Sequence, residues 1–192
     1  MSINKALQKL GYTSSWIEFG IISNEYLLSQ YDEIQNSEDQ NTEHYRCGGF
    51  SNYLNSKEYL TNIEIDNIFK LTDNGPDLCN LHIDRIHQLL YSDILNNEQL
   101  FSLIKYTEVS EPPIQKLYNR KCLLRKIELN GVDSSFDEIM KSNDPDIHRF
   151  ILSLPDIKLH QIKWLSINSN NKKVRNIATQ LSKNKKYRNN DT

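Results

Sequence analysis

Residues 32–54 read DEIQNSEDQNTEHYRCGGFSNYL, an acidic and amide-rich run that passes directly into an aromatic segment with two glycines. Apolar residues recur at helical spacing on both sides of the run: Leu27, Leu28, Tyr31 and Ile34 before it, and Tyr45, Phe50, Tyr53 and Leu54 after it. Ser23 can begin the first helix, and Asn41 or Thr42 can cap the second. The stretch therefore predicts two amphipathic helices joined by an acidic loop.

Two adjacent glycines, Gly48 and Gly49, fall inside the second of these helices. A glycine in a helix interior costs roughly 1 kcal/mol relative to alanine. Their presence therefore predicts that a neighbouring helix packs closely at this point.

The rest of the chain shows the same succession of helix caps and helical apolar spacing, and no strand pattern. Capping boxes begin at Ser15 and Thr61, Pro76 suits a first helical turn, and Asn97 begins another helix. Further helices are predicted over residues 112–127, 135–140, 144–152, 155–167 and 171–181. The predicted fold class is all-α, a short α-solenoid-like stack of antiparallel helix pairs. We expect one domain over residues 1–182 and a basic, disordered tail at 183–192.

A faint internal repeat supports the prediction of stacked helix pairs. Ile114, Ile147 and Val174 each lie near a predicted helix start, and each is followed by further apolar residues at helical steps. The spacing between them is 33 and then 27 residues. Units of this length are typical of solenoids, in which each helix pair buries its apolar side against its neighbours.

Composition bounds the class of protein. A chain of 192 residues with 38% hydrophobic residues can bury a sizeable core without disulfides or metals. Its cysteines, Cys47, Cys79 and Cys122, show neither a disulfide framework nor zinc-ligand spacing. The N-terminal residues lack the apolar segment of a signal peptide, and no apolar run is long enough for a membrane span. We therefore expect a cytoplasmic protein with reduced thiols, no cofactor and no membrane contact.

Charge is distributed unevenly along the chain although its net value is only −2. Residues 1–111 contain 17 Asp and Glu against 7 Lys and Arg, whereas residues 112–192 contain 8 against 16. Such polarity bears on partners and encounter rates rather than on the fold. One half should attract cations and basic proteins, and the other should attract acidic surfaces or nucleic acid.

The segment Glu43-His44-Tyr45-Arg46 places a carboxylate, an imidazole and a guanidinium within four residues. Glu43 and Arg46, three residues apart on a helix, can form a structural salt bridge, and this is the favoured interpretation. Partner binding is the second interpretation. Acid-base catalysis is the third, and it is disfavoured because Glu43 and His44, as helix neighbours, point about 100° apart. A metal site at His82, Asp84 and His87 is also disfavoured, because histidines five residues apart lie on different sides of a helix.

The carboxylates of the acidic run can be either a solvated loop or a docking surface for a basic protein. The members of this cluster are Asp32, Glu33, Glu38, Asp39 and Glu43. Nuclease toxins are cationic where they hold RNA or DNA, so carboxylates on an inhibitor can take the place of phosphates. Tyr31 and Tyr45 would then serve as anchoring aromatic residues if they are exposed beside the cluster.

The basic half offers a rival function, contact with a nucleic-acid backbone. Its basic residues fall along the predicted 112–127 helix, at the start of the last helix and in the tail: Lys116, Arg120, Lys121, Arg125, Lys126, Lys172, Lys173, Arg175, Lys183, Lys185, Lys186 and Arg188. Few aromatic residues are interleaved with them, and the pI is about 6.2. Nucleic-acid binding is therefore the alternative rather than the leading prediction.

Two segments, Asp144-Pro145-Asp146-Ile147 and Val174-Arg175-Asn176-Ile177-Ala178, resemble the inner helices of HEAT-like repeats. The stretch from Trp16 to Phe50, with its Glu43-His44-Tyr45-Arg46 run, resembles helical immunity proteins of bacterial polymorphic toxins, in particular those of contact-dependent growth inhibition systems.

This second resemblance implies a small cytosolic protein that is not an enzyme. Such a protein binds a cognate toxin domain, here expected to be a basic nuclease, and blocks its active site or its access to substrate. No catalytic or metal-binding residue is implied. The residues expected to contact the partner are Asp32, Glu33, Glu38, Asp39, Glu43, His44, Tyr45 and Arg46.

Overall fold

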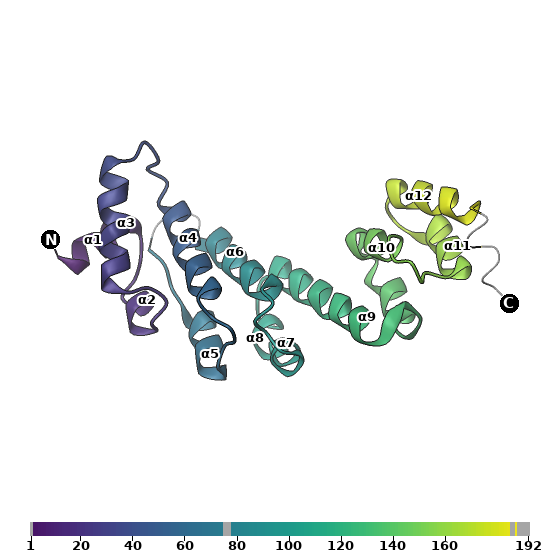
Figure 1. Ribbon diagram of the computed structural model, residues 1–192, viewed down its shortest axis with the longest axis horizontal. Helices are drawn as coiled ribbons and strands as arrows, with labels where there is room; N and C mark the ends of the chain where they lie inside the picture. The colour runs from purple at the N-terminus through teal and green to yellow at the C-terminus, as the bar shows by residue number, and fades with distance from the viewer. Residues whose placement is uncertain (1, 75–77, 185–186, 188–192) are drawn as a thin grey trace. The chain divides into compact units, whose positions relative to one another are not determined.

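The computed structural model describes residues 2–74, 78–184 and 187, and its regular structure is helical throughout. The helices are α1 (Ile3–Leu10), α2 (Ser15–Glu18), α3 (Asn24–Asn36), α4 (Thr42–Asn55), α5 (Asn62–Lys70), α6 (Leu78–Tyr91), α7 (Asn97–Ser102), α8 (Ile104–Thr107), α9 (Pro112–Ser142), α10 (Pro145–Ile151), α11 (Leu159–Asn168) and α12 (Lys172–Ser182) (Figure 1). The all-α prediction is confirmed. The solenoid-like stacking stays a prediction, and the expected helix start at Pro76 lies outside the described residues.

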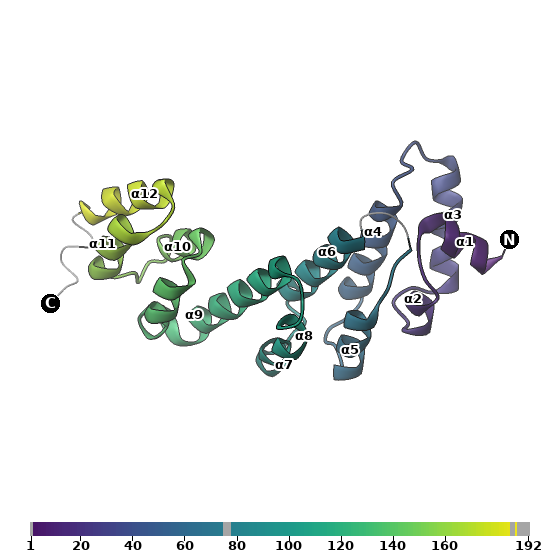
Figure 2. The same cartoon turned by 180° about the vertical axis from the view of Figure 1, so that it is seen from behind.

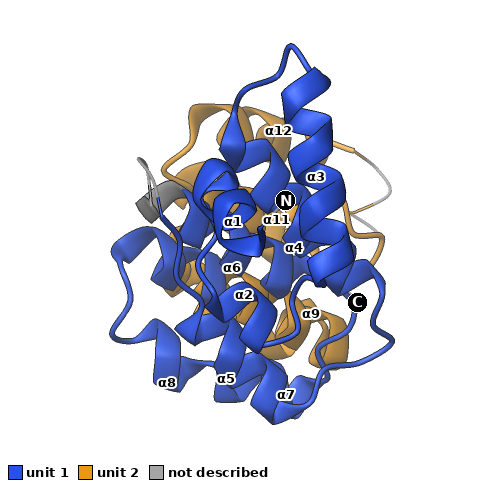
Figure 3. Ribbon diagram, turned by 90° about the vertical axis from the view of Figure 1, so that its left-hand side faces the viewer, with its two compact units in different colours: residues 1–118 blue, residues 119–192 orange. Residues whose placement is uncertain are grey.

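The chain divides into two compact units, residues 1–118 and residues 119–192 (Figure 3). The expectation of one domain over residues 1–182 stays a prediction. The division falls inside helix α9 and close to the change of charge in the sequence. Unit 1 contains 17 Asp and Glu against 8 Lys and Arg, and unit 2 contains 8 against 15. No helix of the described residues has the length and apolar character needed to cross a membrane.

The core of unit 1 is rich in aromatic side chains. The rings of Tyr12 and Trp16 meet edge to face with centroids 4.8 Å apart, and Trp16 meets Phe50 in the same way at 6.5 Å. Such geometry places the positive edge of one ring against the negative face of the next. These residues belong to the turn after α1, to α2 and to α4, so the cluster joins three elements of the N-terminal half.

A group of buried charges lies beside this aromatic cluster. Arg46, Asp73 and Arg85 are at most 3% exposed, and Asp73 forms ion pairs with both arginines. Arg46 also donates a hydrogen bond to the carbonyl of Leu10, next to Gly11, whose φ of +74° favours glycine. Two guanidinium groups thus share one carboxylate in the interior of unit 1.

Unit 2 is built from the C-terminal part of α9 and from α10, α11 and α12; α11 and α12 pack side by side (Figure 2). Helix α9 breaks at Gly131, with φ 79° and ψ 170°, and then continues to Ser142. The helices expected at 112–127 and 135–140 are therefore two segments joined at this break. Tyr187 is buried against the apolar core of this unit, so the expectation of a solvated tail does not hold at that residue.

Candidate functional site: an acidic corner beside a hollow

The C-terminal end of α3, the loop 37–41 and the first turn of α4 form what we call the acidic corner, residues 32–44. Asn41 caps α4 by accepting a hydrogen bond from the backbone N–H of Glu43, as the sequence predicts. The loop projects from the end of the α3 and α4 pair (Figure 1). Its amide side chain Gln40 donates to the carbonyls of Ile34 and Ser37, at 2.8 Å and 2.9 Å. The loop is therefore fastened to the end of α3 by its own side chains.

Asp39 is the carboxylate of this corner that is bonded through both of its oxygens. Its Oδ2 lies 2.8 Å from Nδ1 of His44, and its Oδ1 accepts a hydrogen bond of 2.9 Å from the backbone N–H of Asn41. The hydrogen bond from His44, followed by that from Asn41, lowers the pKa of Asp39 below its ordinary value. The side chains of Asp39 and His44 are 46% and 68% exposed. The pair is thus fixed in position and still open to a partner.

A hollow of about 350 Å³ lies next to this pair, between α3 and α4. The residues that line it are Tyr26, Gln30, Glu33, Ser37, Asp39, His44, Tyr45 and Gly48. A Cβ atom built on Gly48 would meet nothing within 4 Å, so the missing side chain leaves part of this space open. The adjacent Gly49 differs, because a Cβ there would lie 2.8 Å from the hydroxyl of Tyr12. The predicted close packing at the glycine pair is confirmed at Gly49 and not at Gly48.

A buried polar network holds the floor of the hollow. Gln30, which is 4% exposed, donates to the carbonyl of Tyr45 at 2.8 Å and to the hydroxyl of Tyr26 at 3.1 Å. The hydroxyl of Tyr12 lies 2.7 Å from Oε1 of Gln30, and Asn52 donates to the Tyr26 hydroxyl at 2.8 Å. The sequence did not predict this network, because its members lie up to 40 residues apart. Within each helix, their spacing is the same as that of any amphipathic helix.

The expected partner-binding residues divide into two groups. Asp32, Glu33, Glu38, Asp39 and His44 are exposed, and Glu43 is half-buried. Tyr45 and Arg46 are 7% and 0% exposed, so neither presents a side-chain surface to a partner. The favoured salt bridge between Glu43 and Arg46 is not formed; Arg46 pairs with Asp73 instead, with Nε 3.6 Å from Oδ1. Tyr31 is also buried, so the two expected aromatic anchors are both interior residues.

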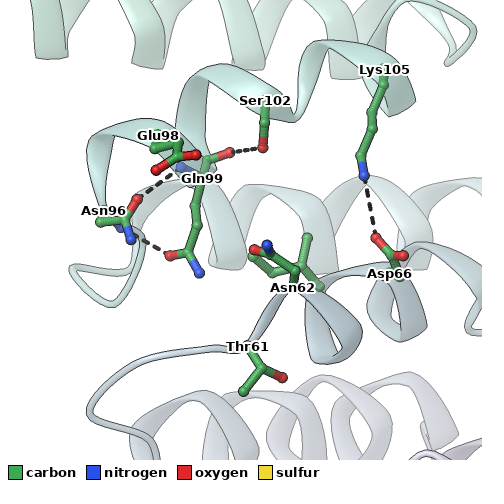
Figure 4. A pocket seen from close by; sticks show the side chains of 9 residues that line it. Thr61, Asn62, Asp66, Asn96, Glu98, Gln99, Ser102 and Lys105 are labelled. Carbon is green, nitrogen blue, oxygen red and sulfur yellow. Dashed lines mark hydrogen bonds and ion pairs between the residues drawn. The ribbon is translucent and has the colours of Figure 1, made fainter.

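A second hollow of unit 1, about 460 Å³ in volume, lies between α5 and α7, and its polar groups are largely bonded to one another (Figure 4). Asn96 and Gln99 form a reciprocal capping box, and Gln99 also donates to the carbonyl of Leu60. Asp66 accepts from Tyr106 and forms an ion pair with Lys105. These bonds brace α5 against α7 and α8. The hollow is larger than that of the acidic corner, but most of the polar side chains that line it already have structural roles.

Some of the basic residues of unit 2 form ion pairs within that unit. Three of the five expected along α9 bind carboxylates of the same unit: Arg120 to Asp144 and Asp146, Arg125 to Glu128, and Lys126 to Glu138. Such pairing reduces the positive charge that this helix offers to phosphates. Nucleic-acid binding by the basic half stays a prediction. Within the described residues, no group of three His, Cys, Asp or Glu side chains is placed to hold a metal ion.

No protein-family model matches this sequence, and searches of curated proteins and of solved structures found no significant match. The assignment of a function therefore depends on the acidic corner itself.

Proposed function

We propose that this chain is an immunity or inhibitor protein that binds a basic toxin domain through the acidic corner of unit 1 and so blocks the toxin's active site or its access to substrate. The observation that carries the proposal is the geometry of Asp39. This carboxylate is held by His44 and by the backbone of Asn41, yet nearly half of its surface faces solvent.

A fixed, exposed carboxylate is suited to binding because less conformational freedom is lost when a partner engages it. Asp32, Glu33 and Glu38 surround it with further exposed negative charge. A toxin that cleaves nucleic acid carries a cationic surface for phosphates, and carboxylates at this corner can occupy that surface. Opposite charges of this kind raise association rates toward roughly 10⁸ M⁻¹s⁻¹ at low salt.

Blocking by occupation requires no catalytic group in the inhibitor. The acidic corner fits this role, because its imidazole is bonded to a carboxylate at an open surface and has no enclosed pocket around it. The acidic corner offers hydrogen-bond acceptors and negative charge, which are sufficient to bind a cationic surface.

The test is a protection assay with the product of the gene adjacent to that of this chain, which we expect to contain the toxin domain, expressed in the cytoplasm of a sensitive host. The wild-type chain should restore growth, and a triple variant with Asp32→Lys, Glu33→Lys and Glu38→Lys should not. The matched control carries Glu25→Lys, Glu58→Lys and Asp93→Lys, which change the net charge equally at exposed sites outside the corner. Protection by the corner variant equal to that of the control would overturn the proposal, as would a neighbouring domain that neither arrests growth nor binds the chain.

A further inference from the structure

We infer that the hollow beside Asp39 is a receptor for one guanidinium group, an arginine side chain that the partner inserts between α3 and α4. The inference rests on the proposed function and names the chemistry of the partner residue at the centre of the contact.

The groups that line the hollow offer mainly acceptors. Glu33 is exposed and forms no hydrogen bond or ion pair with a described residue, so both of its oxygens are available. Asp39 uses one contact on each carboxylate oxygen and keeps the remaining lone pairs. His44 must donate from Nδ1, because the ionised Asp39 can only accept; the neutral ring then has an unprotonated Nε2.

The other polar side chains of the lining are bonded within the protein: Gln30 and Tyr26 in the floor, and Ser37 and the Tyr45 hydroxyl to the backbone of Asp39. Both N–H bonds of the Gln30 amide are used, one on Tyr26 and one on the carbonyl of Tyr45. The Tyr26 hydroxyl accepts from Gln30 and from Asn52. Among the lining residues there are two carboxylates and no lysine or arginine. A ligand that fits must therefore be cationic and rich in donors.

Guanidinium meets these conditions better than the alternatives. It carries five N–H donors in a planar fork and no acceptor, whereas an ammonium group offers three donors on a compact, strongly hydrated charge. Its flat face can also lie against the rings of Tyr26 and His44, which line the hollow. A metal ion is a poorer candidate, because the carboxylates and the imidazole of this corner do not converge on one point.

Gly48 is the residue that makes room for this group. A side chain at position 48 would grow into the hollow, because no atom lies within 4 Å of its Cβ position. Gly48→Phe should therefore fill the receptor while leaving the exposed carboxylates Asp32 and Glu38 in place. Glu33→Gln supplies a second variant that retains the shape and removes one charge, so the inference does not depend on how Gly48→Phe folds.

The experiment is an NMR titration of the full chain with N-acetyl-arginine amide, N-acetyl-lysine amide and N-acetyl-citrulline amide. We expect saturable shifts at the amides of Tyr45 and Gly48 and at the His44 ring with the arginine compound, weaker shifts with lysine and none with citrulline. Removing one charged hydrogen-bonding partner should weaken arginine binding roughly tenfold in Glu33→Gln, and Gly48→Phe should abolish it. Glu58→Gln is the control and should bind as the wild type does.

Equal responses to arginine and citrulline, equal responses to arginine and lysine, or saturable arginine shifts that persist in Gly48→Phe would each overturn the inference. The titration uses no toxin, so it can fail while the protection assay succeeds, and the converse also holds. A chain that protects cells but shows no arginine site has an acidic docking corner without a guanidinium receptor. A chain that binds arginine at the hollow but protects equally well after charge reversal has the receptor and a different function.

Discussion

The two units of this chain handle charge in opposite ways. Unit 1 is acidic at its surface and buries two arginines with one aspartate in its interior. Unit 2 is basic overall and pairs three of the basic residues of α9 with its own carboxylates. Its buried titratable side chains include His148, whose pKa is lowered by burial. The net charge of a unit therefore does not predict which charged or titratable groups are buried in its core. We therefore expect the stability of unit 1 to depend on the buried carboxylate of Asp73. We expect the stability of unit 2 to depend on whether the buried His148 ring is protonated.

The largest effect is expected from Asp73→Asn in unit 1. The change leaves Arg46 and Arg85 buried without a counter-charge, and breaking such a group by removing one partner costs about 3–5 kcal/mol. The chain contains two tryptophans, Trp16 in unit 1 and Trp164 in unit 2, so ¹⁹F NMR of 5-fluorotryptophan protein reports the unfolding of each unit in denaturant. The Trp16 transition should shift strongly and the Trp164 transition much less.

Asp66→Asn is the matched control for this variant, because it removes the charge of a carboxylate of the same unit that is 40% exposed, while an oxygen remains to accept from Tyr106. Its cost should stay within about 1 kcal/mol, as for other surface pairs. Equal destabilisation by the two variants would show that the buried cluster of Arg46, Asp73 and Arg85 contributes no more to the stability of unit 1 than an exposed ion pair does.

A smaller effect, confined to unit 2, is expected from acidification. His148 is fully buried, with Nδ1 3.0 Å from the Ser169 hydroxyl and Nε2 3.3 Å from the carbonyl of Ile139, and burial lowers the pKa of its ring below the ordinary 6.5. The hydrogen bond to the Ile139 carbonyl and, less strongly, the charge of Asp144 oppose this lowering of the pKa only in part. As pH falls below about 6.5, the unfolded state takes up a proton that the folded state does not. Stability should then fall by up to about 1.4 kcal/mol per pH unit until the lowered pKa is reached.

The Trp164 transition measured between pH 7.5 and pH 5 tests this expectation, since the Trp164 ring meets the His148 ring with centroids 5.9 Å apart. His148→Gln should lower the stability at neutral pH but flatten its dependence on pH. His160→Gln, at an exposed position of the same unit, should leave the slope unchanged. If the stability of unit 2 depends on pH as steeply in His148→Gln as in the wild type, another titratable group is responsible for the pH dependence.

The smallest effects are expected at the two glycines of α4, and they should differ in sign. Gly48→Ala adds a methyl group in open space and a better helix former, which should stabilise unit 1 by about 0.5–1 kcal/mol. Gly49→Ala places a methyl group 2.8 Å from the Tyr12 hydroxyl, which is held by Gln30, and should destabilise it. Denaturant unfolding followed at Trp16 compares the two variants directly. Stabilisation by both substitutions would mean that the Tyr12 hydroxyl can move away from the added methyl group at little cost in free energy.

Local features of the fold were predictable from the sequence because their causes are local. Ser23, Asn41 and Thr61 cap their helices as predicted, since a cap depends only on residues within one turn. The continuation of α9 beyond Gly131 was not predicted, because an Asn-Gly pair also ends helices and the sequence alone does not say that the helix resumes. The division into two compact units has no sequence signal of its own, because it falls inside a helix.

The candidate site was predictable in its charge and not in its shape. The exposed carboxylates at positions 32, 33, 38 and 39 follow from an acidic loop between two amphipathic helices. Arg46 was misplaced because its partner Asp73 is 27 residues away, and a buried charge leaves no periodic signal of its own. The hollow was missed because an open glycine such as Gly48 and a packed one such as Gly49 look alike in a sequence.

The central claim, that a basic partner docks on the acidic corner, is tested most directly by zero-length carboxyl-to-amine cross-linking of the chain with the product of the adjacent gene, read out by mass spectrometry. The account predicts that partner lysines become joined to Asp32, Glu33 and Glu38. Partner cross-links confined to carboxylates outside residues 32–44, or to the lysines of unit 2, would contradict it.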